Sequence, residues 1–274
     1  MRLIFLALFS FNIFAQDLAW DRENSCPVGD MAFVEKVLSE MTVEEKVGQT
    51  IMADLDFIKP VDLRRYPIGG ILNGGNTSPN GNQQASTDEW KSLAQDFYEE
   101  SIKTGSNIPI LWGTDAVHGH SNVLGATIFP HNIGLGASAN EQLLEAIGAA
   151  VAEEVLATGL YWTFAPTVTV PQDYRWGRTY EGYSESPELV SKLGESFIYG
   201  LQGKGDEFLK SNKIIGTAKH FLGDGGTYLG VDQGDTKVDE KTLQDIHGTP
   251  YYSALDACIQ TCLLYTSDAA DEFS

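Results

Sequence analysis

Apolar residues recur along the chain in two patterns, and their alternation predicts a fold built from strand–helix units. Stretches with apolar residues at helical spacing alternate with short apolar runs bounded by glycine. The segments predicted to be helical are 33–41, 88–103, 141–158, 187–201 and 239–257. The predicted strands are 48–55, 68–75, 160–170 and 213–221, and residues 108–119 are predicted to be a strand that runs into a loop. Strands spaced by helices in this way are typical of parallel βα units.

Polar residues at the predicted helix ends support these boundaries. Thr42 and Glu45 have the spacing of a capping box, in which each side chain accepts a hydrogen bond from the other's backbone N–H. Asn140 caps the helix that begins at 141, and Pro187 at a first helical position costs no hydrogen bond. The glycine- and asparagine-rich loop between residues 73 and 87 is predicted to be too polar to pack.

Charged residues follow the later predicted strands. Asp115 follows the third strand, and Arg178 with Glu181 follows the fourth. Lys219 and His220 end the fifth. Both a (β/α) barrel and a doubly wound sheet bind ligands at these strand ends, so the pattern leaves both architectures open. No glycine-rich dinucleotide fingerprint opens a helix after the first strand.

The charge of the chain narrows its class of ligand. Its 274 residues carry a formal net charge of −20 with a pI near 4.4. Nucleic-acid binding needs a basic surface, so we expect no nucleic-acid partner. An apolar content of 42% with 28 glycines fits a soluble globular protein with many turns.

The N-terminus has the pattern of a secretory signal peptide over residues 1–15. Arg2 precedes an apolar stretch from Leu3 to Phe14, and Ala15 offers a small residue for cleavage. This stretch is too short to span a bilayer as a permanent helix. A buried N-terminal helix is the alternative, and we expect a periplasmic or secreted protein.

The cysteines and the C-terminal segment give little positive information. Cys26, Cys258 and Cys262 have no regular spacing, so we expect neither a disulfide framework nor a metal-ligand pattern. The segment CLLYTSDAADE resembles the translation of a transposase adapter used in sequencing libraries. We therefore expect residues 262–274 to be an artefact, with a real acidic tail as the alternative.

Asp115 and two nearby histidines are candidate functional residues. A carboxylate at a strand end can accept two sugar hydroxyls, act as a base or nucleophile, or cap the next turn. His118 and His120 stand two residues apart without a third ligand nearby. They are weak evidence for a metal site, and we assign no metal.

The segment DYRWGRTYEGYSESP, residues 173–187, concentrates arginine, aromatic and acidic residues. Arginine donates hydrogen bonds in a fixed fork, and aromatic faces stack on the apolar side of sugar rings. A surface loop with internal salt bridges is the alternative. We favour a functional loop, because loops carry many binding residues.

Lys219 and His220 precede the glycine-rich sequence GDGGT at 223–227. Consecutive strand residues point to opposite faces, so Lys219 could reach solvent while His220 packs inside. Where the strand twists into the glycine-rich loop, both side chains could instead reach one ligand. The pattern by itself leaves both interpretations open.

Five motifs in order resemble the N-terminal barrel domain of glycoside hydrolase family 3, in its exo-acting β-glucosidase branch. They are SEMTVEEKVGQ, GTDAVHGHSNVLGATIFPHNIGLGAS, FAPTVTVPQDYRWGRTYEGYSESPELV, AKHFLGDGGT and DIHGTPYYSALDA, and they cover nearly all of residues 30–260. The resemblance implies an α/β fold, the N-terminal portion of a (β/α)8 barrel truncated after about five βα units. That incomplete domain would occupy residues 16–261.

The resemblance also assigns roles to individual residues. It implies that four side chains bind hydroxyls of the terminal glucose: Asp115, Arg178, Lys219 and His220. It implies supporting roles for four others: Arg175, Glu181, Glu185 and Asp224. Asp224 stands in KHFLGDG where the β-N-acetylglucosaminidase branch has the histidine of KHFPGHG, which disfavours that activity.

Family members are retaining glycosidases, which need two carboxylates. The resemblance places the nucleophilic aspartate in an SDW-like motif on a later strand and the acid/base glutamate in a second domain. No SDW occurs in this sequence. We therefore expect the full-length protein to hydrolyse terminal β-D-glucosyl residues of oligosaccharides or glycosides, without a cofactor, and this chain to be inactive.

Two alternatives come from other classes of protein. One is a non-catalytic fragment that binds carbohydrate. The other is a phosphate-binding barrel enzyme, which would need a glycine-rich phosphate loop that this chain lacks. Because a barrel that stops after five units exposes two sheet edges, we also expect poor solubility.

Overall fold

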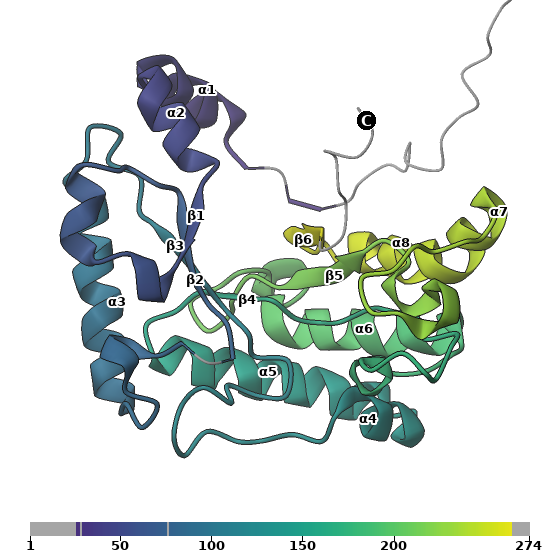
Figure 1. Cartoon of the computed structure of the whole chain (residues 1–274). Helices are drawn as coiled ribbons and strands as arrows, with labels where there is room; N and C mark the ends of the chain where they lie inside the picture. The colour runs from purple at the N-terminus through teal and green to yellow at the C-terminus, as the bar shows by residue number, and fades with distance from the viewer. Residues whose placement is uncertain (1–25, 28, 76, 265–274) are drawn as a thin grey trace, which may run out of the picture.

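Short parallel strands and the helices between them make up the described residues, 26–27, 29–75 and 77–264 of the computed structural model (Figure 1). The strands are β1 (Met52–Asp54), β2 (Gly70–Asn73), β3 (Leu111–Thr114), β4 (Trp162–Thr163), β5 (Thr217–Phe221) and β6 (Thr261–Leu264). The helices are α1 (Met31–Glu40), α2 (Val43–Gln49), α3 (Thr87–Ser101), α4 (Asn132–Ser138), α5 (Glu141–Ala157), α6 (Pro187–Gln202), α7 (Glu240–Thr242) and α8 (Thr249–Asp256). A π-helical segment, Leu243–Gly248, joins α7 to α8.

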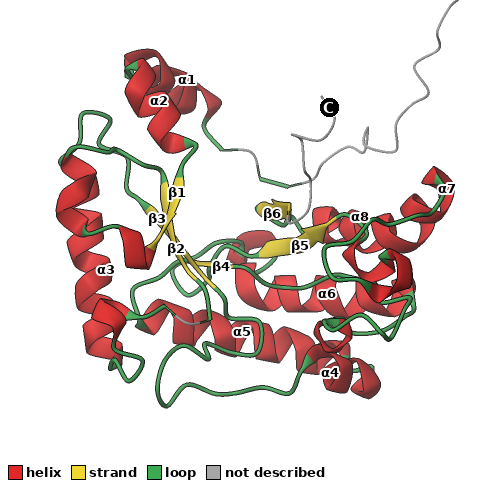
Figure 2. Cartoon of the chain, in the orientation of Figure 1, coloured by secondary structure: helices red, strands yellow, loops and turns green. Residues whose placement is uncertain are grey.

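The strands lie in chain order and are all parallel. β1, β2, β3 and β4 form one sheet, and β5 pairs with β6 in another. Isolated bridges from Trp162 to Ile215 and from Thr167 to Lys219 connect the two sheets. Figure 2 shows α3, α5 and α6 arranged in the same order around the strands. The prediction of parallel βα units is therefore confirmed.

The core lies between the strands and the helices α5 and α6. Each helix contributes a fully buried apolar stripe at helical spacing: Leu144, Val151 and Val155 from α5, and Val190, Leu193, Ile198 and Leu201 from α6. The two helices approach closely because glycine faces the contact. A Cβ atom on Gly200 would lie 2.2 Å from the carbonyl oxygen of Glu145. This packing fixes α6, and with it the end of the loop that precedes α6.

The predicted helix boundaries agree with the structure. The Glu45 carboxylate accepts a hydrogen bond from the backbone N–H of Thr42 at 2.8 Å, and the backbone N–H of Glu45 donates to the Thr42 hydroxyl at 3.2 Å. Asn140 caps α5 through the N–H of Leu143. α1 forms as predicted, but none of its residues is buried among the described part of the chain.

The fourth strand is shorter than predicted. The expected strand over 160–170 is reduced to Trp162–Thr163, although the extended chain continues beside β5, where the N–H of Val168 donates to the carbonyl of Lys219 at 2.8 Å. Pro166 has no N–H to donate, which interrupts the ladder at its centre. The loop over 73–87 also differs from expectation, because Ser78, Pro79 and Ala85 are buried.

The interpretation of the cysteines is wrong in one respect. Cys26 and Cys258 form a disulfide, with their Cα atoms 5.4 Å apart. They are separated by 232 residues, so spacing along the chain carries no sign of the pairing. The fold itself brings residue 26 to the end of α8, which only the tertiary structure reveals.

The two chain ends are described only in part. The predicted signal peptide, 1–15, lies outside the described residues, as do residues 265–274. Cys262, Leu263 and Leu264, which the sequence interpretation assigned to an artefact, pair with β5 as part of β6. Within the described ranges, no helix has the length and apolarity needed to cross a membrane.

Candidate functional site

A pocket of about 270 Å³ lies at the carboxyl ends of the strands, among the charged residues that the sequence singled out. Asp115 follows β3 directly, Lys219 lies in β5, and Arg178 and Glu181 come from the loop between β4 and α6. All four side chains line the pocket. Because parallel strands end at one edge, segments that are far apart in the sequence meet here.

Lys219 and Asp115 form an ion pair across the pocket wall. The Lys219 Nζ atom lies 2.9 Å from Asp115 Oδ1, with side-chain exposures of 5% and 38%. A lysine this deeply buried needs a partner, and the partly exposed carboxylate provides one. Each group retains hydrogen-bonding capacity beyond the pair, since an ammonium has three donors and a carboxylate can accept several hydrogen bonds.

Arg178 and Glu181 form a second, bidentate pair. Arg178 Nε and Nη2 donate to the two carboxylate oxygens of Glu181, each at 2.8 Å. Burial pushes the pKa of Glu181 upward, but the Arg178 hydrogen bonds and the nearby positive charges outweigh burial, so its pKa lies below the ordinary value. Glu181 therefore remains ionised and holds the guanidinium plane in one orientation.

His220 lies behind Arg178. Its Nδ1 is 2.7 Å from Asp224 Oδ2, and its Nε2 is 3.0 Å from Arg178 Nη2. The arginine can only donate, so Nε2 accepts and the proton sits on Nδ1, where Asp224 accepts it. Asp224 in turn accepts from the Thr169 hydroxyl at 2.6 Å.

The sequence predicts that His220 touches ligand, and in the structure its imidazole contacts Arg178 and Asp224. Its side chain is 3% exposed, and it is not one of the residues that line the pocket. Both ring nitrogens have protein partners, Arg178 Nη2 at Nε2 and Asp224 Oδ2 at Nδ1. Asp224, predicted as a supporting residue, contacts the imidazole of His220 through Oδ2.

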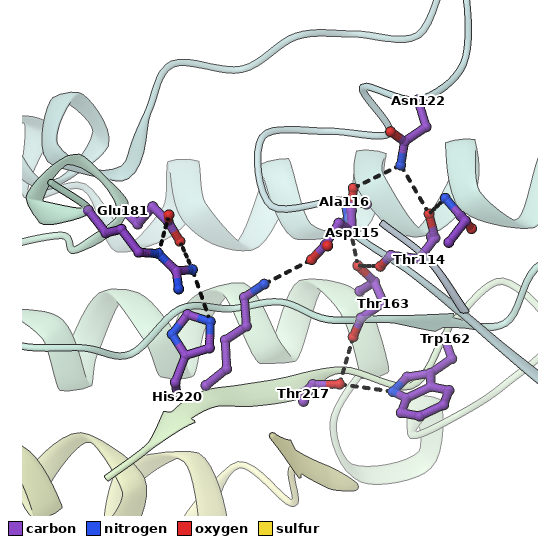
Figure 3. Close-up of polar contacts among 12 residues, drawn as sticks. Thr114, Asp115, Ala116, Asn122, Trp162, Thr163, Glu181, Thr217 and His220 are labelled. Carbon is purple, nitrogen blue, oxygen red and sulfur yellow. Dashed lines mark hydrogen bonds and ion pairs between the residues drawn. The ribbon is translucent and has the colours of Figure 1, made fainter. Parts of the chain in front are cut away.

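A buried network of hydroxyl groups holds the strand ends in place (Figure 3). The Thr163 hydroxyl donates to the carbonyl of Thr114 at 3.1 Å, and the Thr217 hydroxyl donates to the carbonyl of Thr163 at 2.8 Å. The backbone N–H of Ala116 donates to Thr163 Oγ1 at 3.2 Å. These contacts tie β3, β4 and β5 together immediately below Asp115.

The other two predicted supporting residues lie outside the pocket. Arg175 pairs with Asp173 at 2.5 Å, and its side chain is 65% exposed. Glu185 accepts a hydrogen bond from the Tyr174 hydroxyl. Both contacts lie in the outer half of the loop, which we define as Asp173, Tyr174, Arg175 and Glu185. Neither Arg175 nor Glu185 belongs to the charged group around Arg178, which forms the inner half.

Sequence reasoning considered His118 only as a metal ligand, whereas the structure gives it a place on the pocket wall. His118 Nε2 is 2.8 Å from His131 Nδ1, and Tyr180 packs against the His131 ring with centroids 4.6 Å apart. Burial, and then the neighbouring His131, lower the pKa of His118 to about 4. Within the described residues, no three potential ligands gather to hold a metal ion. Two histidines separated by 13 positions carry no sequence signal for this pairing.

Comparison with known proteins identifies relatives of this chain. The model of the glycosyl hydrolase family 3 N terminal domain matches residues 42–267. The periplasmic beta-glucosidase of Salmonella typhimurium is 30% identical over 231 residues, which cover 82% of this chain and 28% of that protein. The lysosomal beta glucosidase of Dictyostelium discoideum is 28% identical over 232 residues, covering 77% of this chain and 28% of that protein.

A solved structure agrees with the fold. The exo-1,3/1,4-beta-glucanase of a Pseudoalteromonas species superposes with a TM-score of 0.83 at 49% identity. The match covers 86% of this chain and 30% of that one. The chain thus spans less than a third of the length of each of these three proteins.

Proposed function

Because the chain belongs to glycosyl hydrolase family 3 through its N-terminal domain, we propose that its pocket binds the terminal glucose of a β-glucoside. The strands and helices would be the N-terminal part of a (β/α)8 barrel. In the whole protein this pocket would serve the retaining hydrolysis of terminal β-D-glucosyl residues from oligosaccharides or glycosides. The relatives described as beta-glucosidases and the exo-1,3/1,4-beta-glucanase support this substrate class.

The observation that carries the proposal is the combination of donors and acceptors around one small pocket. Lys219 and Arg178 supply hydrogen-bond donors, and Asp115 supplies a carboxylate acceptor that is still partly exposed. A glucose ring presents hydroxyl groups that both donate and accept, so it matches such a mixed set. The charges of the four groups balance in two pairs, Lys219 with Asp115 and Arg178 with Glu181. A neutral ligand therefore fits better than an ionic one.

His220 would act on the sugar through Arg178. The chain Thr169–Asp224–His220–Arg178 fixes the guanidinium from behind, while Glu181 fixes its fork from the side. A preorganised arginine loses little conformational entropy when a hydroxyl binds to it. We therefore propose Asp115, Lys219 and Arg178 as the direct sugar ligands and His220 as a positioning residue.

The carboxylates of the pocket are poorly suited to cleave the glycosidic bond. A general acid needs a raised pKa, whereas the pKa of Glu181 is lowered. Asp115 is held by a buried lysine. We therefore propose that the reacting carboxylates of the enzyme are other residues, and that this chain binds the sugar without hydrolysing it.

Two observations support export of the protein. The Cys26–Cys258 disulfide is a bond that persists in oxidising compartments. One relative is described as periplasmic, which agrees with a periplasmic or secreted location. We propose such a location for this protein.

Titration of the 274-residue chain with D-glucose by isothermal titration calorimetry tests the proposed function. We expect saturable binding that Asp115→Ala weakens by at least about tenfold, because the variant removes the carboxylate and leaves buried Lys219 unpaired. Asp173→Ala is the matched control, since Asp173 pairs with an exposed arginine outside the pocket. Equal affinity in both variants would contradict the proposal. No turnover of an aryl β-glucoside is expected from the chain.

A further inference from the structure

Two residues on the wall of the pocket share contact with one exposed histidine. We call the pocket of Asp115 and Arg178 the sugar pocket, and His118 and Tyr180 both line it. His131, an exposed residue immediately before α4, is not among the described residues that line it. The centroid of the His131 ring lies 4.1 Å from that of His118 and 4.6 Å from that of Tyr180, edge to face in both cases. His131 therefore supports two residues of the wall.

The hydrogen bond between the two imidazoles fixes the orientation of the His118 ring. His131 Nδ1 lies 2.8 Å from His118 Nε2, so one of these nitrogens donates and the other accepts. The other ring nitrogen of His118, Nδ1, is buried and has no partner among the described residues. Rotation of a histidine ring about its Cβ–Cγ bond has only broad preferences, so a hydrogen bond is needed to hold the ring in one orientation. His131 supplies that hydrogen bond.

The orientation of His118 matters because its ring stands beside the charged groups of the sugar pocket. Burial, and next His131, act most strongly on the pKa of His118, and the charges of Glu181 and Lys219 then raise and lower it, respectively. Glu181 and Lys219 belong to the two different ion pairs of the pocket. An imidazole that turned freely at this point would disturb both pairs and take up part of the space that the sugar needs.

The start of α4 provides a rigid base for His131. Asn132, the first residue of α4, is 1% exposed, and its Nδ2 donates to the backbone carbonyl of Glu181 at 2.7 Å. α4 also lies directly against the loop that follows β4, because a Cβ atom on Gly136 would be 1.7 Å from the carbonyl oxygen of Tyr183. The backbone at His131 is thus fixed to the same loop that carries the arginine of the sugar pocket.

We infer that His131 is a positioning residue for the sugar pocket, which holds the His118 imidazole in place without touching the sugar. The inference rests on the proposed function and extends it to a residue outside the site. His118 follows β3 close to Asp115, whereas His131 is tied through α4 to the loop of Arg178. The hydrogen bond between the two histidines therefore joins two of the segments that supply sugar ligands. A site joined in this way loses less conformational entropy when a sugar binds.

Calorimetric titration of the 274-residue chain with D-glucose tests this role through two variants of His131. His131→Phe keeps a ring beside Tyr180 but has no nitrogen for His118, so the dissociation constant should rise roughly threefold to tenfold, as for one lost hydrogen bond. In His131→Asn, the side-chain amide can donate or accept at the position of the imidazole Nδ1. We expect this variant to bind glucose within about twofold of the wild type. Restoration by asparagine, which has no ring, separates the hydrogen bond from packing.

Ile133→Phe is the matched control, since it introduces the same side chain at another exposed position near the start of α4 that does not line the sugar pocket. The control should bind glucose like the wild type. Equal affinity in His131→Phe and the wild type would overturn the positioning role, and so would an equal loss in His131→Asn or in Ile133→Phe. In each of these cases the proposed function stands if Asp115→Ala still weakens binding. If the wild type binds no glucose, both proposals fail.

Discussion

Two arginines three residues apart differ in almost every physical respect. Arg175 and Arg178 belong to the same loop, and each pairs with a nearby carboxylate. The Arg175 side chain is 65% exposed and contacts Asp173 outside the pocket. The Arg178 side chain is 20% exposed and contacts both Glu181 and His220. The residue type is identical, so the difference arises from the surroundings.

This comparison shows which half of the loop is prepared for binding. The inner half is fixed from two sides, by a bidentate carboxylate and by an imidazole that Asp224 orients. In the outer half, Arg175 pairs with Asp173 and Tyr174 donates to Glu185, all within the loop. Exposed ion pairs contribute little to stability because water screens them and ordering long side chains costs entropy. We therefore expect substitutions in the two halves to have very different effects.

The largest difference is expected between Arg178→Met and Arg175→Met. Loss of Arg178 leaves the Glu181 carboxylate buried without its partner, and breaking a buried pair in this way lowers the free energy of unfolding by about 3 kcal/mol. Arg175→Met should leave the free energy of unfolding nearly unchanged. Urea denaturation of both variants measures the two effects. Similar losses in the two variants would mean that burial does not separate the halves of the loop.

The pH dependence of stability should show a similar contrast between buried and exposed groups. Burial lowers the pKa of His120 to about 4, since the charged imidazolium loses its hydration there. Its Nε2 contacts the Thr158 hydroxyl, and its Nδ1 has no partner among the described residues. As the pH falls, the His120 imidazole becomes protonated near pH 6.5 in the unfolded chain but only near pH 4 in the folded chain. Stability contributed by neutral His120 is thus complete above pH 6.5 and falls by roughly 3 kcal/mol as the pH decreases to 4.

The exposed pair should act in a separate and more acidic window. The Arg175 hydrogen bond lowers the pKa of Asp173 to about 2. Its contribution is present above the unfolded pKa near 3.8 and disappears as the pH falls through 2. Urea denaturation from about pH 8 to about pH 3 should therefore record a histidine step, to which buried His118 also contributes, and His120→Asn should make that step smaller. Asp173→Asn should leave that step unchanged; a histidine step that disappears in Asp173→Asn would contradict the assignment.

A smaller effect is expected from Asp224→Asn compared with Asp173→Asn. The amide oxygen of Asn can still accept from His220 Nδ1, but the charge that strengthens this bond is lost. We expect the free energy of unfolding to fall by about 1–2 kcal/mol and glucose affinity to fall severalfold. Asp173→Asn should change neither quantity measurably. Unchanged glucose affinity in Asp224→Asn would separate His220 from the binding of sugar.

The smallest effect is expected from Tyr174→Phe. This variant removes the hydrogen bond to Glu185 on the outer half of the loop and nothing in the pocket. Both the midpoint of urea denaturation and glucose affinity should match the wild type within experimental error. A clear loss of glucose affinity would show that the outer half of the loop shapes the pocket.

The sequence predicted the elements well because helices and strands here have regular apolar periods. The parallel order of strands and the gathering of Asp115, Arg178 and Lys219 at one edge also followed from it. The contacts of His220 did not, because a residue's neighbours at a strand end depend on how the next loop folds back. Asp224 stands only four residues later, yet the sequence GDGG does not indicate that the Asp224 carboxylate contacts the His220 imidazole.

Long-range pairings were beyond the reach of sequence patterns for another reason. Cys26 meets Cys258 across 232 residues, and His118 meets His131 across a loop without regular structure. The polar loop over 73–87 was expected to remain unpacked, but Ser78 is buried and the 3-10 turn after it packs against α3 and Leu55–Phe57. Such contacts depend on tertiary packing, which local periodicity does not encode.

The binding of D-glucose to Arg178→Lys and Arg175→Lys tests the central claim most directly. Lysine keeps the positive charge at both positions but lacks the planar fork that Glu181 and His220 hold in place. Isothermal titration calorimetry should give equal dissociation constants for the wild type and Arg175→Lys, and a value at least about tenfold higher for Arg178→Lys. Equal affinity in Arg178→Lys and Arg175→Lys would contradict the claim that the inner half of the loop binds the sugar.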